Sequence, residues 1–275
     1  MRFFFLGFTI IFFLNLIPEV FVLYQFVKKT FPVLKPNARI IAYYSFSLAV
    51  YSFYNIAILV YTKDLTGIIS FIITRIELSF YRVLFALRFK ESYYAYIIVF
   101  FNLSLFVYLY LNWETIKSLI QRSYSRKIGA DVSIRNLYLV RCLYGSYQEF
   151  TFIFYINEVF FRLNVFTYSA LSSAIVFLNL LPIFITLVVK RFEAENEDMD
   201  AKKIAFCCFI IIDVSILFTL VTDSQKSNTL IASKFIMIFN QIHFIILTIM
   251  CVVDYSIYGK GLKEAYNKTR GKTKL

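Results

Sequence analysis

The sequence predicts an all-α, polytopic membrane helix bundle with seven transmembrane helices. Hydrophobic residues make up 60% of the 275 residues, charged residues only 17%, and the mean hydropathy is +0.69. Soluble domains are about 45–50% apolar and about 25% charged. Apolar segments of about 20 residues, the length that crosses a bilayer as a helix, recur from end to end. The short alternating segments of a membrane β-barrel are absent.

Seven apolar segments are expected to span the membrane within a single transmembrane domain, 1–275. They are Phe3–Phe26, Ile40–Tyr61, Tyr93–Trp113, Asn136–Phe160, Asn164–Val189, Ile204–Thr222 and Leu230–Tyr258. The first is too long for a signal peptide and lacks a small-residue cleavage site, so it is expected to be a helix, kinked at Pro18. Polar or basic stretches separate the segments, and the polar connector Glu114–Arg135 is the longest of those with a clear assignment.

The stretch Thr62–Glu91 leaves two alternatives open. Its apolar part, Gly67–Thr74, is followed by Arg75, Glu77, Arg82 and Arg88. Charges at mid-bilayer cost at least a few kcal/mol each. The stretch is therefore either a long loop with an amphipathic interfacial helix, or an eighth span whose charged face, with Arg75, Ser79 and Arg82, points into a bundle.

The distribution of Lys and Arg predicts a cytoplasmic C-terminus. With seven spans and the N-terminus outside, the cytoplasmic segments hold nineteen Lys and Arg and the outer segments eight, as the positive-inside rule requires. With eight spans and both termini inside, the rule is also broadly obeyed, failing mainly for the loop Lys28–Arg39, so the distribution does not separate seven spans from eight. The loop Lys190–Lys203, between helices 5 and 6 of the seven-span arrangement, and the basic tail Gly259–Leu275 are expected to be cytoplasmic. The net charge of +12 is explained by this retention and by attraction to anionic lipid headgroups, and nucleic acid is not an expected partner.

Ionisable residues inside the predicted spans are the candidates for a ligand pocket, because such residues are functional by default. They are Arg141, Glu149, Glu158, Asp213 and His243. The alternative is that they form only intramembrane salt bridges, such as Arg141 with Glu149, or Lys234 with Asp213.

No catalytic, metal-binding or cofactor-binding pattern occurs in the sequence. The chain has one His and four Cys, with no CxxC pair, no Gly-rich phosphate loop and no HExxH motif. We therefore expect no enzyme activity, metal or cofactor.

Three short motifs carry a resemblance to a receptor family. Arg191-Phe192-Glu193-Ala194-Glu195-Asn196 follows the fifth span, Leu178-Asn179-Leu180 lies within it, and Lys35-Pro36-Asn37-Ala38-Arg39 lies in the first loop. These motifs resemble those of nematode serpentine chemoreceptors of the Sra superfamily (classes Sra, Srab, Srb and Sre). Glu193 stands where that family has Gln, and Lys35 where it has His.

The resemblance implies a GPCR-like receptor of the plasma membrane that detects a small extracellular chemical. It also implies a heterotrimeric G protein as partner, and the expected cytoplasmic contacts are Arg191, Phe192, Glu195 and Asn196. The alternative for this loop is a solvated connector with no partner. The alternative for the chain is a multi-pass transporter or a ligand-gated channel of the gustatory-receptor kind, which would use the same intramembrane charges as its path.

Overall fold

A computed structural model of the chain describes its helices in two compact units. The described residues are 65–88, 93–129, 131–164, 170–224 and 231–265, together with 7, 10, 13, 14, 17, 48–52, 54 and 55. Among these residues the structure contains helices and turns but no strand, which confirms the all-α prediction there. The units are Met1–Gln121 and Arg122–Leu275. The predictions of a single domain and of seven spans stay predictions.

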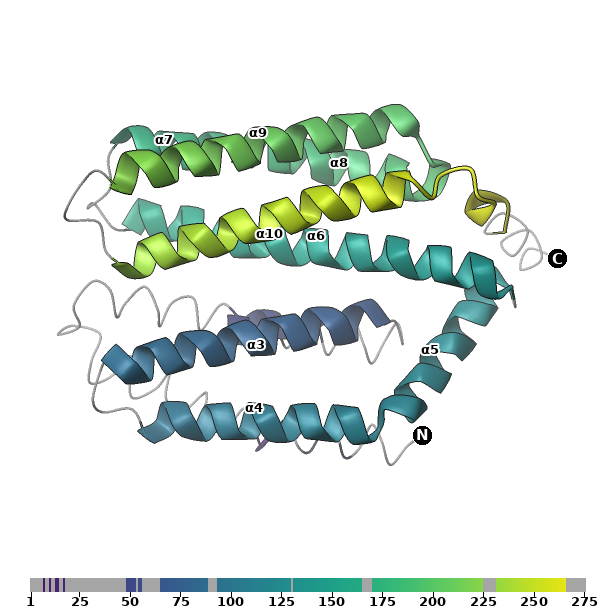
Figure 1. Cartoon of the computed structure of the whole chain (residues 1–275), viewed down its shortest axis with the longest axis horizontal. Coiled ribbons are helices and arrows are strands. Elements are labelled where there is room, and N and C mark those ends of the chain that lie inside the picture. The colour runs from purple at the N-terminus through teal and green to yellow at the C-terminus, as the bar shows by residue number, and fades with distance from the viewer. Residues whose placement is uncertain are drawn as a thin grey trace. The chain divides into compact units, whose positions relative to one another are not determined.

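The first unit contains α3 (Leu65–Arg88) and α4 (Tyr93–Leu111), which lie side by side (Figure 1). Arg75 on α3 is fully buried, and its Nη1 donates a hydrogen bond to Asn102 Oδ1 on α4 at 3.3 Å. Asn102 Nδ2 in turn donates to Ser79 Oγ at 2.9 Å. The described part of the ambiguous stretch, 65–88, is therefore helical, with part of its polar face packed against α4. Whether it crosses the bilayer stays open.

The predicted spans Phe3–Phe26 and Ile40–Tyr61 lie mostly outside the described residues, as does the first loop between them.

The expected polar connector after α4 is a helix, α5 (Trp113–Ile128), which crosses the division between the units. Its buried side chains Ile116, Ile120, Tyr124 and Ile128 recur every four residues, so one face is apolar. Gly129, with φ of 95°, ends the helix in the left-handed region that glycine adopts without strain. The segment was predicted to be a connector because its overall composition is polar, and the four-residue spacing of its apolar side chains was not recognised.

The long helices described in the second unit after α5 form a bundle. They are α6 (Val132–Asn164), α7 (Ala170–Leu178), α8 (Leu180–Asn196), α9 (Met199–Ser224) and α10 (Ile231–Tyr255). Within this unit α9 packs against α8 and α10, and α10 packs against α6 (Figure 1). Its core is aromatic, with the ring of Phe152 on α6 lying 6.2 Å from that of Phe209 and 6.3 Å from that of Phe244.

The fifth predicted span is interrupted at Asn179, between α7 and α8. Pro182 has no N–H to donate to the carbonyl of Leu178, four residues earlier, so the ladder lacks a bond there. The flanking bonds from Asn179 N to Ile175 O and from Ile183 N to Asn179 O are present, at 3.1 and 3.3 Å. The two helices α7 and α8 are therefore continuous except for this break.

The predicted loop Lys190–Lys203 is mostly helical. α8 continues to Asn196, α9 begins at Met199, and only Glu197 and Asp198 lie between them. Asp198 Oδ1 accepts hydrogen bonds from the N–H groups of Asp200 and Ala201, which caps α9. The charged run was predicted to be a loop, but its Glu, Lys and Ala residues have high helix propensity. The run therefore forms the polar ends of α8 and α9.

Three described helical stretches are long and apolar enough to cross a membrane. They are Ser173–Lys190, Met199–Thr222 and Lys234–Tyr255. The outer faces of α9 and α10 expose large apolar side chains, such as Ile211, Val214, Ile245 and Ile249, which lipid would cover. These features fit the predicted integral membrane protein.

Candidate functional site

Four charged side chains from four parts of the second unit meet at one end of the bundle. Arg141 on α6 lies 3.1 Å from Glu197 and 3.3 Å from Asp254 on α10. Lys202 on α9 lies 2.8 Å from the second oxygen of Asp254. The side chains of Arg141, Glu197, Lys202 and Asp254 are 12%, 8%, 1% and 2% exposed. We refer to these four residues as the ion-pair cluster.

Two tyrosine rings and a backbone amide complete the cluster. The Lys202 Nζ lies 3.5 Å from the ring centroid of Tyr144, and the Arg141 guanidinium lies 4.9 Å from that of Tyr258. Such cation–π contacts gain strength when water is excluded. The N–H of Gly259, just beyond α10, donates to Glu197 Oε2 at 3.1 Å. The turn between α8 and α9 is thus attached to α6 and to the end of α10.

The cluster balances two positive and two negative charges in a buried place. Removing one partner of a buried pair typically costs about 3–5 kcal/mol, because the other charge is left buried. The same pairs add little net stability over an apolar core, since bringing the charges out of water is costly. The cluster therefore links α6, the turn between α8 and α9, the start of α9 and the end of α10 to one another.

A second ion pair joins α8 to α6 near the cluster. Lys190 Nζ lies 2.7 Å from Glu149 Oε1 and donates to the backbone carbonyl of Gly145 at 3.1 Å. The alternative pairing of Arg141 with Glu149, considered from the sequence, is wrong. Eight residues separate them along α6, a rise of about 12 Å, and each has a partner on another element.

Two of the candidate pocket residues lie on the interface of α6 with α10. His243 Nδ1 and the Tyr147 hydroxyl are 2.6 Å apart, and the rings of Phe150 and Phe154 lie 5.2 and 5.4 Å from the imidazole. Further along α6, the Glu158 carboxylate accepts a hydrogen bond from the Asn240 amide. Both ionisable groups are buried, so they stand in a polar strip along this interface.

Asp213 lies on α9 and faces α10. Its oxygens accept hydrogen bonds from Gln241 Nε2 at 2.9 Å and from the Thr248 hydroxyl at 3.0 Å. Within the described residues, Asp213 makes these two hydrogen bonds and no ion pair with Lys234. On the same helix Ser215 accepts a hydrogen bond from Asn179, which also donates to the Tyr155 hydroxyl. The break in the fifth span is thereby bonded to α6 and α9.

The five predicted pocket residues have separate partners rather than one another. Arg141 belongs to the ion-pair cluster, Glu149 pairs with Lys190, and the other three bond side chains of α6 or α10. The predicted partner contacts Arg191, Phe192, Glu195 and Asn196 lie in the last turns of α8, and their side chains are outside the described part.

The sequence reasoning missed Glu197, Lys202 and Asp254 as site residues. A usable signal was present: each is a charged residue at the edge of an apolar span, the position where charges from neighbouring helices meet. Among the described residues no three His, Cys, Asp or Glu side chains gather as metal ligands.

Comparisons of the chain with protein-family models, with curated proteins and with solved structures gave no match.

Proposed function

We propose that the chain is a chemosensory receptor of the plasma membrane, built on seven transmembrane helices, that signals through a heterotrimeric G protein. The observation that supports it best is the ion-pair cluster. It binds the turn between α8 and α9 to α6 and α10, at the end of the bundle that the charge distribution assigns to the cytoplasm. A signalling surface built from these segments is held in one arrangement while the cluster is intact.

The mechanism is a shift between two populations of the bundle. A small extracellular chemical that binds one arrangement more tightly raises its population by that difference in affinity. Glu158 and His243, on the α6–α10 interface, are the proposed ligand contacts, together with Asp213 on α9, which bonds Gln241 and Thr248 of α10. Movement of α10 at this level would strain the bond of Asp254 to Arg141 and Lys202. The proposal assigns the chain no catalysis and no cofactor.

Signalling by Asp254→Asn tests the proposal. In cells that express the full chain and a reporter of G-protein activation, this variant should raise the ligand-independent signal several-fold, because both cations lose a full charge partner. Lys260→Gln, which removes an exposed lysine outside the cluster, is the matched control and should match wild type. Surface labelling of an epitope normalises each signal.

Two results would overturn the receptor proposal. One is a basal signal of Asp254→Asn equal to wild type at equal surface expression, with Glu197→Gln behaving the same way. The other is an N-terminal epitope that is reached only after the cells are permeabilised, because the seven-helix receptor places that terminus outside.

The second candidate is a transporter or ligand-gated channel. The row of buried or partly buried polar side chains on α9 and α10, Asp213, Asn240 and His243, favours it, since buried ionisable groups also line ion and proton paths. Currents across membranes that contain only the purified chain would support this candidate, and their absence alongside G-protein signalling would exclude it.

A further inference from the structure

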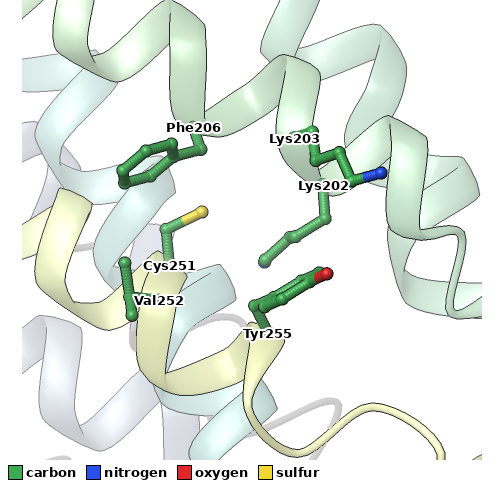
Figure 2. A pocket seen from close by; sticks show the side chains of 6 residues that line it. All are labelled: Lys202, Lys203, Phe206, Cys251, Val252 and Tyr255. Carbon is green, nitrogen blue, oxygen red and sulfur yellow. The ribbon is translucent and has the colours of Figure 1, made fainter.

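A pocket of about 220 Å³ opens between α9 and α10, near the ion-pair cluster but on the outer side of these helices. Its lining residues are Lys202, Lys203, Phe206, Cys251, Val252 and Tyr255 (Figure 2). Figure 2 shows Phe206 and Val252 on one side, with the polar ends of Lys203 and Tyr255 directed away on the other. Drug-sized ligands need about 300–1,000 Å³, so this pocket suits part of a larger amphiphile.

The pocket lies where two membrane-length helices end. The apolar stretch of α9 starts at Met199 and that of α10 finishes at Tyr255, and the two helices are adjacent. Lys203 and Tyr255 therefore lie at the polar end of this helix pair. Phe206 and Cys251 are three and four residues further into the spans, about 5 Å deeper at 1.5 Å per residue. A ligand here meets donors at the rim and apolar side chains below.

Lys202 and Lys203 differ in solvent exposure and in ion-pair partner. Lys202 is buried and bonded to Asp254, whereas the Lys203 side chain is 63% exposed. Lys203 pairs with Asp200 at 2.9 Å, and the Asp200 side chain is 85% exposed. Exposed pairs of this kind contribute little, so an incoming phosphate can replace the Asp200 carboxylate. The Tyr255 hydroxyl is a second donor at the same rim.

We propose that this pocket binds an anionic phospholipid from the surrounding leaflet. Its phosphate lies against Lys203 and Tyr255, and the upper carbons of one acyl chain pack on Phe206, Cys251 and Val252. A lipid whose headgroup has a net negative charge is favoured over a zwitterionic lipid, because Lys203 repels a headgroup cation that no second anion balances. This inference requires α9 and α10 to cross the membrane, and it does not depend on the receptor function.

Lipid titration of the purified full chain in detergent tests the site. Dioctanoyl phosphatidylserine should raise the thermal midpoint in a saturable way, dioctanoyl phosphatidylcholine should raise it less, and inorganic phosphate should leave it unchanged. Lys203→Gln should weaken the apparent affinity for phosphatidylserine about five-fold, the usual effect of one lysine at an anionic surface. Asp200→Asn should strengthen it, because Lys203 loses its competitor.

The control variant is Lys260→Gln, which removes an exposed lysine from the same end of the bundle without touching the pocket. An equal loss of affinity in this variant would mean that surface charge alone attracts the lipid, and would overturn the proposal. Equal effects of the two lipids, or a full effect of inorganic phosphate, would overturn it as well. If Lys203→Gln fails to fold, the test rests on Asp200→Asn, which should bind phosphatidylserine more tightly than wild type. Weaker or unchanged binding of phosphatidylserine by Asp200→Asn would contradict the site.

Discussion

Lys202 and Lys203 are neighbours at the start of α9, yet their surroundings are opposite. The Lys202 side chain is 1% exposed, 2.8 Å from Asp254 and against the ring of Tyr144, while Lys203 extends into solvent beside Asp200. Two adjacent helical residues point about 100° apart, so one faces α6 and α10 and the other faces away. The energetic roles of these residues follow from that rotation.

Replacing Lys202 by Met should therefore destabilise the fold by about 3–5 kcal/mol, because Asp254 stays buried with one cation fewer. Lys203→Met should leave the thermal midpoint in lipid-free detergent unchanged. Thermal unfolding of the purified chain, followed by circular dichroism, measures both. Equal midpoints for the two variants would contradict the buried ion pair.

The hydroxyl of Tyr147 should also matter to stability. Tyr147→Phe removes the 2.6 Å hydrogen bond to His243 within the bundle, and the loss of such a buried bond costs about 1–3 kcal/mol. The midpoint of thermal unfolding should fall accordingly. Tyr110→Phe, at a side chain that is 80% exposed, is the control, and a comparable fall there would argue against a specific role for the hydroxyl of Tyr147.

Among the helices, two glycines should respond to substitution with opposite signs. Gly129, after α5, has a φ of 95°, whereas Gly145 lies within α6, where an added Cβ meets only Lys190 at an ordinary 3.8 Å. Gly129→Ala forces a side chain into the left-handed region and should cost about 1 kcal/mol. Gly145→Ala should be neutral or gain up to about 1 kcal/mol from helix propensity.

Chemical or thermal unfolding of the two variants measures this difference. A stabilising Gly129→Ala would show that α5 and α6 are not joined by a left-handed turn. A strongly destabilising Gly145→Ala would show that the approach of Lys190 to α6 is closer than described.

Helices that are apolar along their whole length were predictable from the sequence. The segment Ile204–Thr222 corresponds to α9, and Leu230–Tyr258 to α10, with ends that differ by a few residues. The start of α9 was missed because the helix extends beyond the apolar part into charged residues that propensity favours. For the same reason the polar segment Glu114–Arg135 was not predicted to contain α5. The helix α10 instead ends at Tyr255, three residues before the predicted end, where the chain enters a turn.

The ion-pair cluster was beyond sequence reasoning. Arg141, Glu197 and Asp254 are separated by 56 and 57 positions, and their meeting depends on how α6 and α10 are rotated about their axes. An apolar run does not specify that rotation when every side of a helix is apolar, as on α9. Arg75 is a different case, because its polar neighbours on one face of α3 made an inward direction one of the two alternatives for this stretch. The structure has Arg75 fully buried, with a hydrogen bond to Asn102.

At the scale of the whole molecule, the antiparallel pair α9 and α10 makes a prediction about membrane sides. Met199 and Ser256 lie at one end of the pair and Val221 at the other, and all three side chains are exposed. In intact cells a membrane-impermeant thiol reagent should label Val221→Cys and leave Met199→Cys and Ser256→Cys unlabelled until the cells are permeabilised.

The unmodified chain is the control, since its exposed Cys207 lies within the apolar part of α9 and should stay unlabelled throughout. Labelling of Met199→Cys and Val221→Cys from the same side would show that α9 does not cross the bilayer.

The length of α6 has a consequence for what stands outside the membrane. Its 33 residues extend about 50 Å, whereas the hydrocarbon layer is about 30 Å thick. The ion-pair cluster marks the level at which α9 begins and α10 ends, and Arg141 is the tenth residue of α6. The nine residues before it extend α6 about 13 Å beyond that level. In the proposed topology this end of α6 projects from the bilayer into the cytoplasm, where a protein partner would contact it before it reached the lipid.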